Sequence, residues 1–289
     1  WKWILDMNNL LQNASQDTEN PLSNFPVMIK RYRKSRARSQ FELSLDAVVS
    51  QKHLSFLETG RAKPSREMVL VLAEALDLPL RDRNLLLNAA GFSSFFRQKA
   101  LDSEEMDAVY KVLELSLNHH DPYPAIVVDR NWNLLMSNDA TRRFIALLGD
   151  PDDVWKKVDP TGKKNTYRLT FHSEGLRPLI GNWQELEKHL LVRLQREVND
   201  CPENTDLSLL LEDLIEGSSG GLSLDSTEIA SHLGPIIPMD IVFGSIRLKI
   251  FSMISSFGSA LDVTAEELKV ETFFPADDIT KDFFQRLAA

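Results

Sequence analysis

The strongest constraint on the fold is a pair of short helical patterns in residues 39–58, separated only by residues 48–49. Ser39 and Glu42 form the S-x-x-E pattern of a capping box, which predicts the start of the first helix. Ser50 can cap a second helix in the same way. Helices that begin so close together along the chain must cross at a tight turn.

The apolar spacing agrees with these two helices. Leu43 and Ala47 fall on one face of the first helix, and Leu54 and Leu57 fall on one face of the second. A third segment starts after Pro64. Two short helices, a tight turn and a third segment predict a helix-turn-helix arrangement.

Residues 25–92 are basic within an acidic chain. They hold twelve Lys or Arg and seven Asp or Glu, a net charge of +5, whereas the whole chain carries -9. This distribution suggests that one region meets a polyanion and that the rest avoids it. The stretch MIKRYRKSRAR could by itself be a solvated charged helix, but beside the two crossing helices it favours nucleic-acid binding.

Composition shifts along the 289 residues predict four segments. We expect a polar lead-in over 1–24, an all-α domain over 25–92, a helical connector over 93–121 and an α+β domain over 122–289. Within the connector, apolar residues recur at helical spacing over 104–118.

The C-terminal half predicts strands around a helical middle. YPAIVVDRNWNLLMSN is typical of a strand, a tight turn and a second strand. We expect a helix over 139–148, an exposed loop over 149–164, mostly helix over 166–216 and a flexible loop over 217–223. The alternating, β-branched tail predicts further strands, with Gly244-Ser245 as a hairpin turn.

Several classes of protein are disfavoured by what the sequence lacks. No run approaches 18 apolar residues, so we expect no membrane insertion. Cys201 is the only cysteine, which fits a reducing compartment, so we expect a cytoplasmic location. His119 and His120 would point in different directions from a helix, and phosphate-loop and nucleophile motifs are absent from the sequence. We therefore expect no enzyme activity, no catalytic residue, no metal and no resident cofactor.

Residues 25–92 resemble the helix-turn-helix domain of the XRE/Cro-like repressors. The matching positions are Gln40, Leu43, Ser44, Val49, Leu54, Leu57, Glu58, Gly60 and Pro64. The turn residue of that family is usually Gly, whereas this chain has Val48. A β-branched residue is disfavoured at φ > 0, so the turn is either built differently or strained.

The resemblance implies that the segment from Gln51 to Leu57 is a recognition helix that lies in a DNA major groove. Gln51 can bond adenine, Lys52 can bond guanine, and Phe56 could meet a thymine methyl group. Side chains around this helix would contact phosphates, and Gln40 would also help to hold Gln51. The DNA-contacting residues that we expect are Gln40, Gln51, Lys52, His53, Ser55, Phe56, Arg61 and Lys63. Phe56 could instead belong to the core, and His53 could be a plain surface residue.

The order of the helix-turn-helix, VVDRNWNLLMSN and LTFHSEGLRPLIGNW resembles the MmyB-like transcription regulators over nearly the whole chain after about residue 25. The resemblance implies a PAS-like C-terminal domain, with helices over a sheet and an apolar pocket for a fatty-acid-like ligand. It also implies a homodimer that binds double-stranded DNA. The ligand-binding residues that we expect are Trp132, Phe171, Arg177, Asn182, Trp183 and Phe251. Arg177 could anchor a carboxylate or serve a structural ion pair.

We therefore expect a one-component transcription regulator that senses an apolar small molecule. In one alternative, the C-terminal domain is a protein-interaction or dimerisation module without a ligand, and its aromatic residues are plain core. In another, that half is an enzyme regulated together with the DNA-binding head. A filled interior would favour the first alternative, and turnover in a metabolite screen would favour the second.

Overall fold

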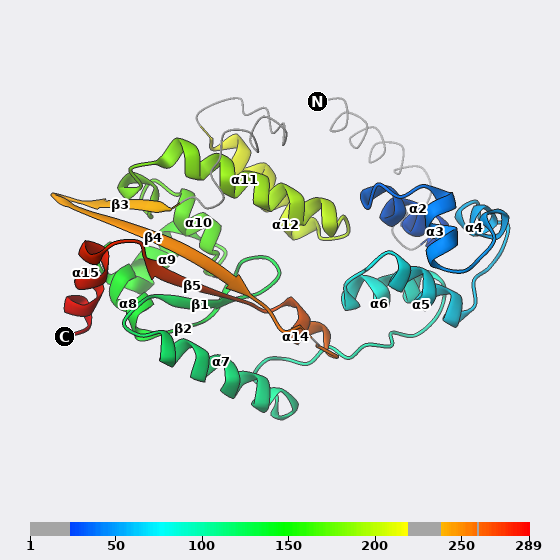
Figure 1. Cartoon of the computed structure of the whole chain (residues 1–289), viewed down its shortest axis with the longest axis horizontal. Coiled ribbons are helices and arrows are strands. Elements are labelled where there is room, and N and C mark those ends of the chain that lie inside the picture. The colour runs from blue at the N-terminus through cyan, green and yellow to red at the C-terminus, as the bar shows by residue number, and fades with distance from the viewer. Residues whose placement is uncertain (1–23, 219–237, 259) are drawn as a thin grey trace. The chain divides into compact units, whose positions relative to one another are not determined.

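The computed structural model describes residues 24–218, 238–258 and 260–289 (Figure 1). They form two compact units. The first comprises residues 24–97 with the segment 199–203, and the second comprises the remainder of the described residues from 98 onward. The expected lead-in, apart from Asn24, and most of the loop expected at 217–223 lie outside the described residues.

The first unit is helical, as expected. Its helices are α2 (Phe25–Ser35), α3 (Gln40–Asp46), α4 (Gln51–Glu58), α5 (Arg66–Ala75) and α6 (Leu80–Ala89). The predicted capping box is confirmed, because Ser39 Oγ accepts from the Glu42 amide and Glu42 Oε2 accepts from the Ser39 amide. Ser50 Oγ accepts from the His53 amide at 3.1 Å, which fixes the start of α4.

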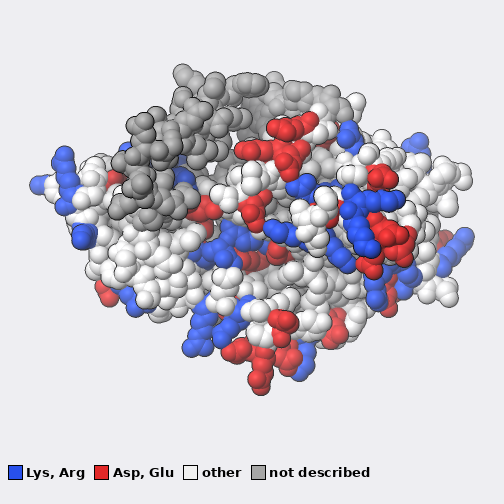
Figure 2. Space-filling view, turned by 180° about the vertical axis from the view of Figure 1, so that it is seen from behind, with Lys and Arg blue, Asp and Glu red and all other residues white. Residues whose placement is uncertain are grey.

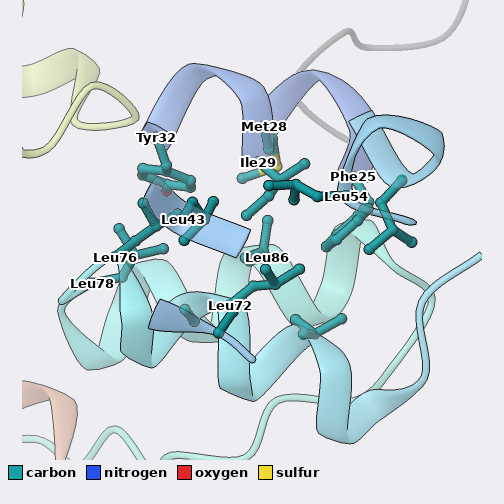
Figure 3. Close-up of a cluster of buried hydrophobic side chains, with 14 of the residues drawn as sticks. Phe25, Met28, Ile29, Tyr32, Leu43, Leu54, Leu72, Leu76, Leu78 and Leu86 are labelled. Carbon is teal, nitrogen blue, oxygen red and sulfur yellow. The ribbon is translucent and has the colours of Figure 1, made fainter. Parts of the chain in front are cut away.

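All five helices contribute to one hydrophobic core in this unit. Ile29 and Tyr32 from α2, Leu43 from α3 and Leu54 from α4 point toward one another (Figure 3). Leu72 from α5 and Leu86 from α6 close the core from the other side. The short helices are held by this shared burial, since isolated helices of 7 to 11 residues are marginal in water.

The turn between α3 and α4 is left-handed at Val48, where φ is 54°. The Val48 amide donates to Leu45 O at 3.1 Å and the Val49 amide donates to Ser44 O at 2.9 Å. The side chain of Val48 is 91% exposed, so packing does not compensate for its backbone conformation. The turn therefore has a positive φ at this position and strains a β-branched residue.

The second unit contains a five-stranded antiparallel sheet with the strand order β2-β1-β5-β4-β3. The strands are β1 (Ala125–Val128), β2 (Leu134–Ser137), β3 (Met239–Phe243), β4 (Ile246–Ser255) and β5 (Lys269–Pro275). The two predicted hairpins are confirmed: β1 pairs with β2, and β3 pairs with β4 through Gly244, whose φ is 58°. The expected α+β class is thereby confirmed.

Helices lie on both sides of the sheet (Figure 1), and alternate residues of β1 pack against these two layers. Ala125 and Val127 pack with Leu113 and Leu117 of α7 (Asp107–His120). Ile126 and Val128 pack on the other face of the sheet, against α10 (Thr166–Phe171), α11 (Trp183–Asp200) and α12 (Thr205–Glu216). The expected connector 93–121 thus includes a helix that covers one face of the sheet, preceded by the short η3 (Glu104–Met106).

Further helices belong to this unit. They are α8 (Asp139–Ala146), α9 (Pro151–Val158), η4 (Arg177–Leu179), α14 (Val263–Glu267) and α15 (Asp278–Ala288). Within the described residues, no helix is both long enough and apolar enough to cross a bilayer.

Two expectations for this unit were wrong or incomplete. The exposed loop expected at 149–164 contains α9, which begins after its cap Asp150 and buries Val154, Trp155 and Val158. Its Asp and Lys residues form the solvent-exposed face of an amphipathic helix. Because these charged residues dominate the segment, its apolar face was not recognised from the sequence. The helices α14 and α15 were not expected in the tail, where only strands were predicted. Asp262 caps α14, Asp277 caps α15, and Phe284 is on the buried face of α15.

Candidate functional site

One face of the helix α4 is buried in the core, and the other face is exposed to solvent. Leu54 and Leu57 are fully buried, whereas Gln51 and Lys52 are exposed at its first turn. Ser50 caps the helix at that same turn, so these two side chains project from a fixed backbone. Such a helix has the form that enters a DNA major groove with its N-terminal residues toward the bases.

Phe56 lies at the edge of this surface and is half-buried. Lys52 Nζ lies 5.7 Å from the centre of its ring and Arg61 Cζ lies 6.0 Å from it. These are cation–π distances, so the Phe56 ring holds two positively charged side chains close to the helix. His53 and Ser55 are half-buried, and Arg61 and Lys63 are exposed in the segment after α4. Seven of the eight expected DNA-contacting residues therefore lie on or directly after α4.

The eighth, Gln40, belongs to a buried ion-pair cluster. Its Nε2 donates to Glu58 Oε2 at 2.8 Å. Arg33 Nε and Nη2 donate to the same carboxylate at 2.6 and 2.8 Å. Burial opposes ionisation of Glu58, but the hydrogen bonds from Arg33 and Gln40 hold its pKa below the ordinary value. The cluster ties the end of α4 to α2 and to the start of α3.

A cavity of about 110 Å³ lies between the sheet and the helices of the second unit. All five strands contribute to its wall, together with α8, α9, α10 and α11. The apolar lining includes Ile126, Leu134, Phe144, Trp155, Leu169, Leu190, Met239, Ile241, Ile250 and Phe273. Hydroxyls in the wall are already engaged: Thr141 donates to Ala125 O, Thr166 to Trp132 O and Thr170 to Thr166 O. The cavity suits an apolar molecule.

Three other polar side chains line this cavity: Tyr167, Arg193 and Glu271. Arg193 Nε donates to Tyr167 Oη at 2.9 Å, and Tyr167 Oη donates to Leu190 O at 3.4 Å. Burial raises the pKa of the Tyr167 hydroxyl, so the group stays protonated. Arg193 Nη1 lies 3.9 Å from Glu271 Oε1, which is an ion pair longer than a hydrogen bond.

Trp132 holds the guanidinium of Arg193 in place. Arg193 Cζ and Lys269 Nζ each lie 4.3 Å from the centre of a Trp132 ring. Trp132 Nε1 donates to Glu197 Oε2 at 2.9 Å, and the same carboxylate oxygen pairs with Lys269. Trp132 is almost fully buried, and its φ of 65° is rare for a bulky residue. A strained backbone thus places this indole against the polar end of the cavity.

The six residues expected to bind ligand are not among those that line the cavity. Trp132 contacts Arg193 from behind, and Phe171 lies between Tyr167 and Trp183 in an aromatic row. Trp183 also carries Arg177 over its ring at 5.1 Å.

The other two are placed away from it. Asn182 fastens the start of α11 to β3, because its Oδ1 accepts from the Asp240 amide and its Nδ2 donates to Pro238 O. Phe251 lies across from Phe274, on the face of β4 opposite the cavity-lining Ile250.

The polar residues of the cavity were not found by sequence reasoning. Tyr167 and Arg193 belong to different helices, and each is an ordinary helix residue in isolation. The one usable signal was Glu271 in KVETFFP, a carboxylate at an inward position of an apolar strand. A buried charge needs a partner, so a carboxylate at this position indicates a polar group opposite β5.

Two family models match two different parts of the chain. A model of the MmyB-like transcription regulator ligand binding domain matches residues 109–287, which is more than half of the chain. A helix-turn-helix model matches residues 29–82. No curated protein matches the chain. The first match covers the sheet, the cavity and α7 from Val109 onward, and the second covers α3 and α4 entirely.

Proposed function

Because the chain belongs to the MmyB-like transcription regulators, it is a DNA-binding transcription regulator with a ligand-binding domain, and we propose that its ligand is an apolar, fatty-acid-like molecule. One observation carries this proposal: the cavity of about 110 Å³ has a mainly apolar wall and, among the described residues, one polar group formed by Tyr167, Arg193 and Glu271. An amphipathic molecule fits this division, with its chain in the apolar part and its head at the polar group.

The size of the cavity limits how much of a chain it takes. A dry apolar cavity of about 150 Å³ can hold a benzene molecule, so the present volume of about 110 Å³ accommodates a few carbons. A longer chain needs side chains to move, and Met239 in the wall is of the adaptable kind. Each methylene that leaves water adds about 0.8 kcal/mol, so affinity should rise with chain length until the wall no longer yields.

For the DNA-binding unit, we assign base contacts to Gln51 and Lys52 and phosphate contacts to Arg61 and Lys63. The support is their exposure on and after α4. A single recognition helix reads few base pairs, so the functional species is a homodimer on two half-sites about 34 Å apart. A DNA partner also implies the compartment that holds the genome, which we expect to be the cytoplasm.

The ligand regulates DNA binding only if it binds one arrangement of the regulator better than another. DNA affinity measured with and without ligand reports that difference directly. A ligand that left the affinity unchanged would be a structural component rather than a signal.

The first test compares native and denaturing mass spectra of the full-chain protein, before and after addition of 1-decanol or decanoate. We expect a bound mass that is lost on denaturation, either co-purified or added. If no bound mass is found under any of these conditions, the domain does not sense such molecules, and the protein-interaction alternative is favoured instead.

A further inference from the structure

The polar group of the cavity has unused hydrogen-bonding capacity on two side chains. The Tyr167 hydroxyl already accepts from Arg193 Nε and donates its only proton to Leu190 O. In contrast, Arg193 Nη1 and Glu271 Oε1 are 3.9 Å apart, beyond hydrogen-bond distance. Among the described residues, Glu271 has no closer charged partner, although its side chain is largely buried.

The other charges around this group are already paired with one another. Glu197 accepts from Trp132 Nε1 and pairs with Lys269 at 2.5 Å. Lys269 and Arg193 both lie over Trp132. Arg193 and Glu271 are therefore the two groups at the cavity that a ligand head can engage.

The chemistry of these two groups selects the head. Arg193 only donates hydrogen bonds and an ionised Glu271 only accepts them. One oxygen at about 2.9 Å from each would span a separation of 3.9 Å. That oxygen must accept from Arg193 and donate to Glu271. A hydroxyl does both, whereas a carboxylate has no proton to donate and places a second negative charge beside Glu271.

We propose that the head group of the ligand is a neutral hydroxyl that bridges Arg193 and Glu271, and that Glu271 rejects carboxylates. This inference rests on the proposed function, because it takes the cavity to be the ligand site. It assigns Glu271 as a residue that determines specificity. The ligand class is then a fatty-acid-like apolar chain whose head is an alcohol in place of an ionised carboxylate.

The test is isothermal titration calorimetry of the full-chain protein at pH 7.5 with 1-decanol and with decanoate, which have equal chain lengths. We expect 1-decanol to bind at least about ten-fold more tightly, because like charges repel strongly at this short range. The variant Glu271→Gln removes the negative charge with little change in shape. It should bind decanoate at least about ten-fold more tightly than the wild type does.

A matched control is Glu212→Gln, which removes an exposed carboxylate of α12 and should leave both affinities unchanged. Circular dichroism of each variant checks that it is folded. Wild-type binding of decanoate as tight as that of 1-decanol overturns the head-group assignment and leaves the proposed function standing. Failure of both molecules to bind overturns the proposed function as well.

Discussion

Arg33 on α2 donates two hydrogen bonds to the carboxylate of Glu58 on α4, at 2.6 and 2.8 Å. Glu58 follows the buried Leu57 at the end of the helix that carries Gln51 and Lys52. The pair therefore ties the end of the proposed recognition helix to α2 and fixes its orientation within the unit. Removal of one partner leaves the other charge buried without compensation.

We predict that Glu58→Gln lowers the free energy of unfolding of the first unit by about 3 kcal/mol at pH 7. The pKa of Glu58 is lowered in the folded state, so its contribution is present above the unfolded pKa and is lost as pH falls through the folded value. The difference between wild type and variant should therefore shrink on acidification. Urea unfolding followed by circular dichroism at pH 7 and at acidic pH measures both effects.

The control for this prediction is Glu74→Gln, which breaks the exposed ion pair between Glu74 and Arg83. An exposed pair contributes less than about 1 kcal/mol. Equal losses in the two variants would show that the Arg33–Glu58 pair does not hold the unit together.

Substitutions on α4 should change the sequence specificity of DNA binding, whereas substitutions in the segment after it should change the overall affinity. Gln51→Ala should relax the preferred DNA sequence, because Gln51 is assigned to a base edge. Lys63→Ala should weaken binding to all sequences alike and reduce the salt slope by about 1, because it is assigned to phosphate. Selection from a random DNA pool and salt titrations measure these properties. Lys281→Ala, an exposed lysine of α15, is the control. An unchanged preferred sequence for Gln51→Ala would mean that another residue reads the bases.

The guanidinium of Arg193 should contribute to ligand affinity. Arg193→Met keeps an unbranched chain against Trp132 but removes the hydrogen bond to Tyr167 and the charge opposite Glu271. A hydrogen bond to a charged group contributes about 1.5–3 kcal/mol, so 1-decanol should bind roughly ten- to one-hundred-fold more weakly. Calorimetry with Arg196→Met, an exposed arginine of the same helix, provides the comparison. Unaltered affinity in Arg193→Met would place the ligand head elsewhere.

Val48→Gly should stabilise the first unit. Val48 has a φ of 54° and is 91% exposed, so the substitution relieves left-handed strain without removing core contacts. The strain costs about 1–2 kcal/mol, and the greater freedom of glycine in the unfolded chain offsets roughly 0.5–1 kcal/mol of this. A rise in Tm of several degrees is expected in thermal unfolding. Val49→Gly should lower Tm instead, because Val49 packs against the core. A fall in Tm for Val48→Gly would mean that the turn is not strained.

Local features of the sequence determined the elements of the DNA-binding unit. The capping box of Ser39 and Glu42, the cap at Ser50 and the apolar spacing of Leu54 and Leu57 each act within one turn of helix. The Gly244 hairpin is equally local. Short-range hydrogen bonds and periodicity decide such features, so they can be read without knowledge of the rest of the chain.

Only the tertiary structure decided which residues line the proposed ligand cavity. Tyr167, Arg193 and Glu271 come from α10, α11 and β5, and no spacing along the chain links them. Conversely, the aromatic residues expected in the pocket have the composition of a ligand site, but they pack behind it or on another face. The sequence by itself predicted the caps at Ser39 and Ser50 and most of the helices and strands, but not α9, α14 or α15. Which side chains meet at the cavity depends on how the helices pack over the sheet, because contacts between distant segments are set by shared burial rather than by local pattern.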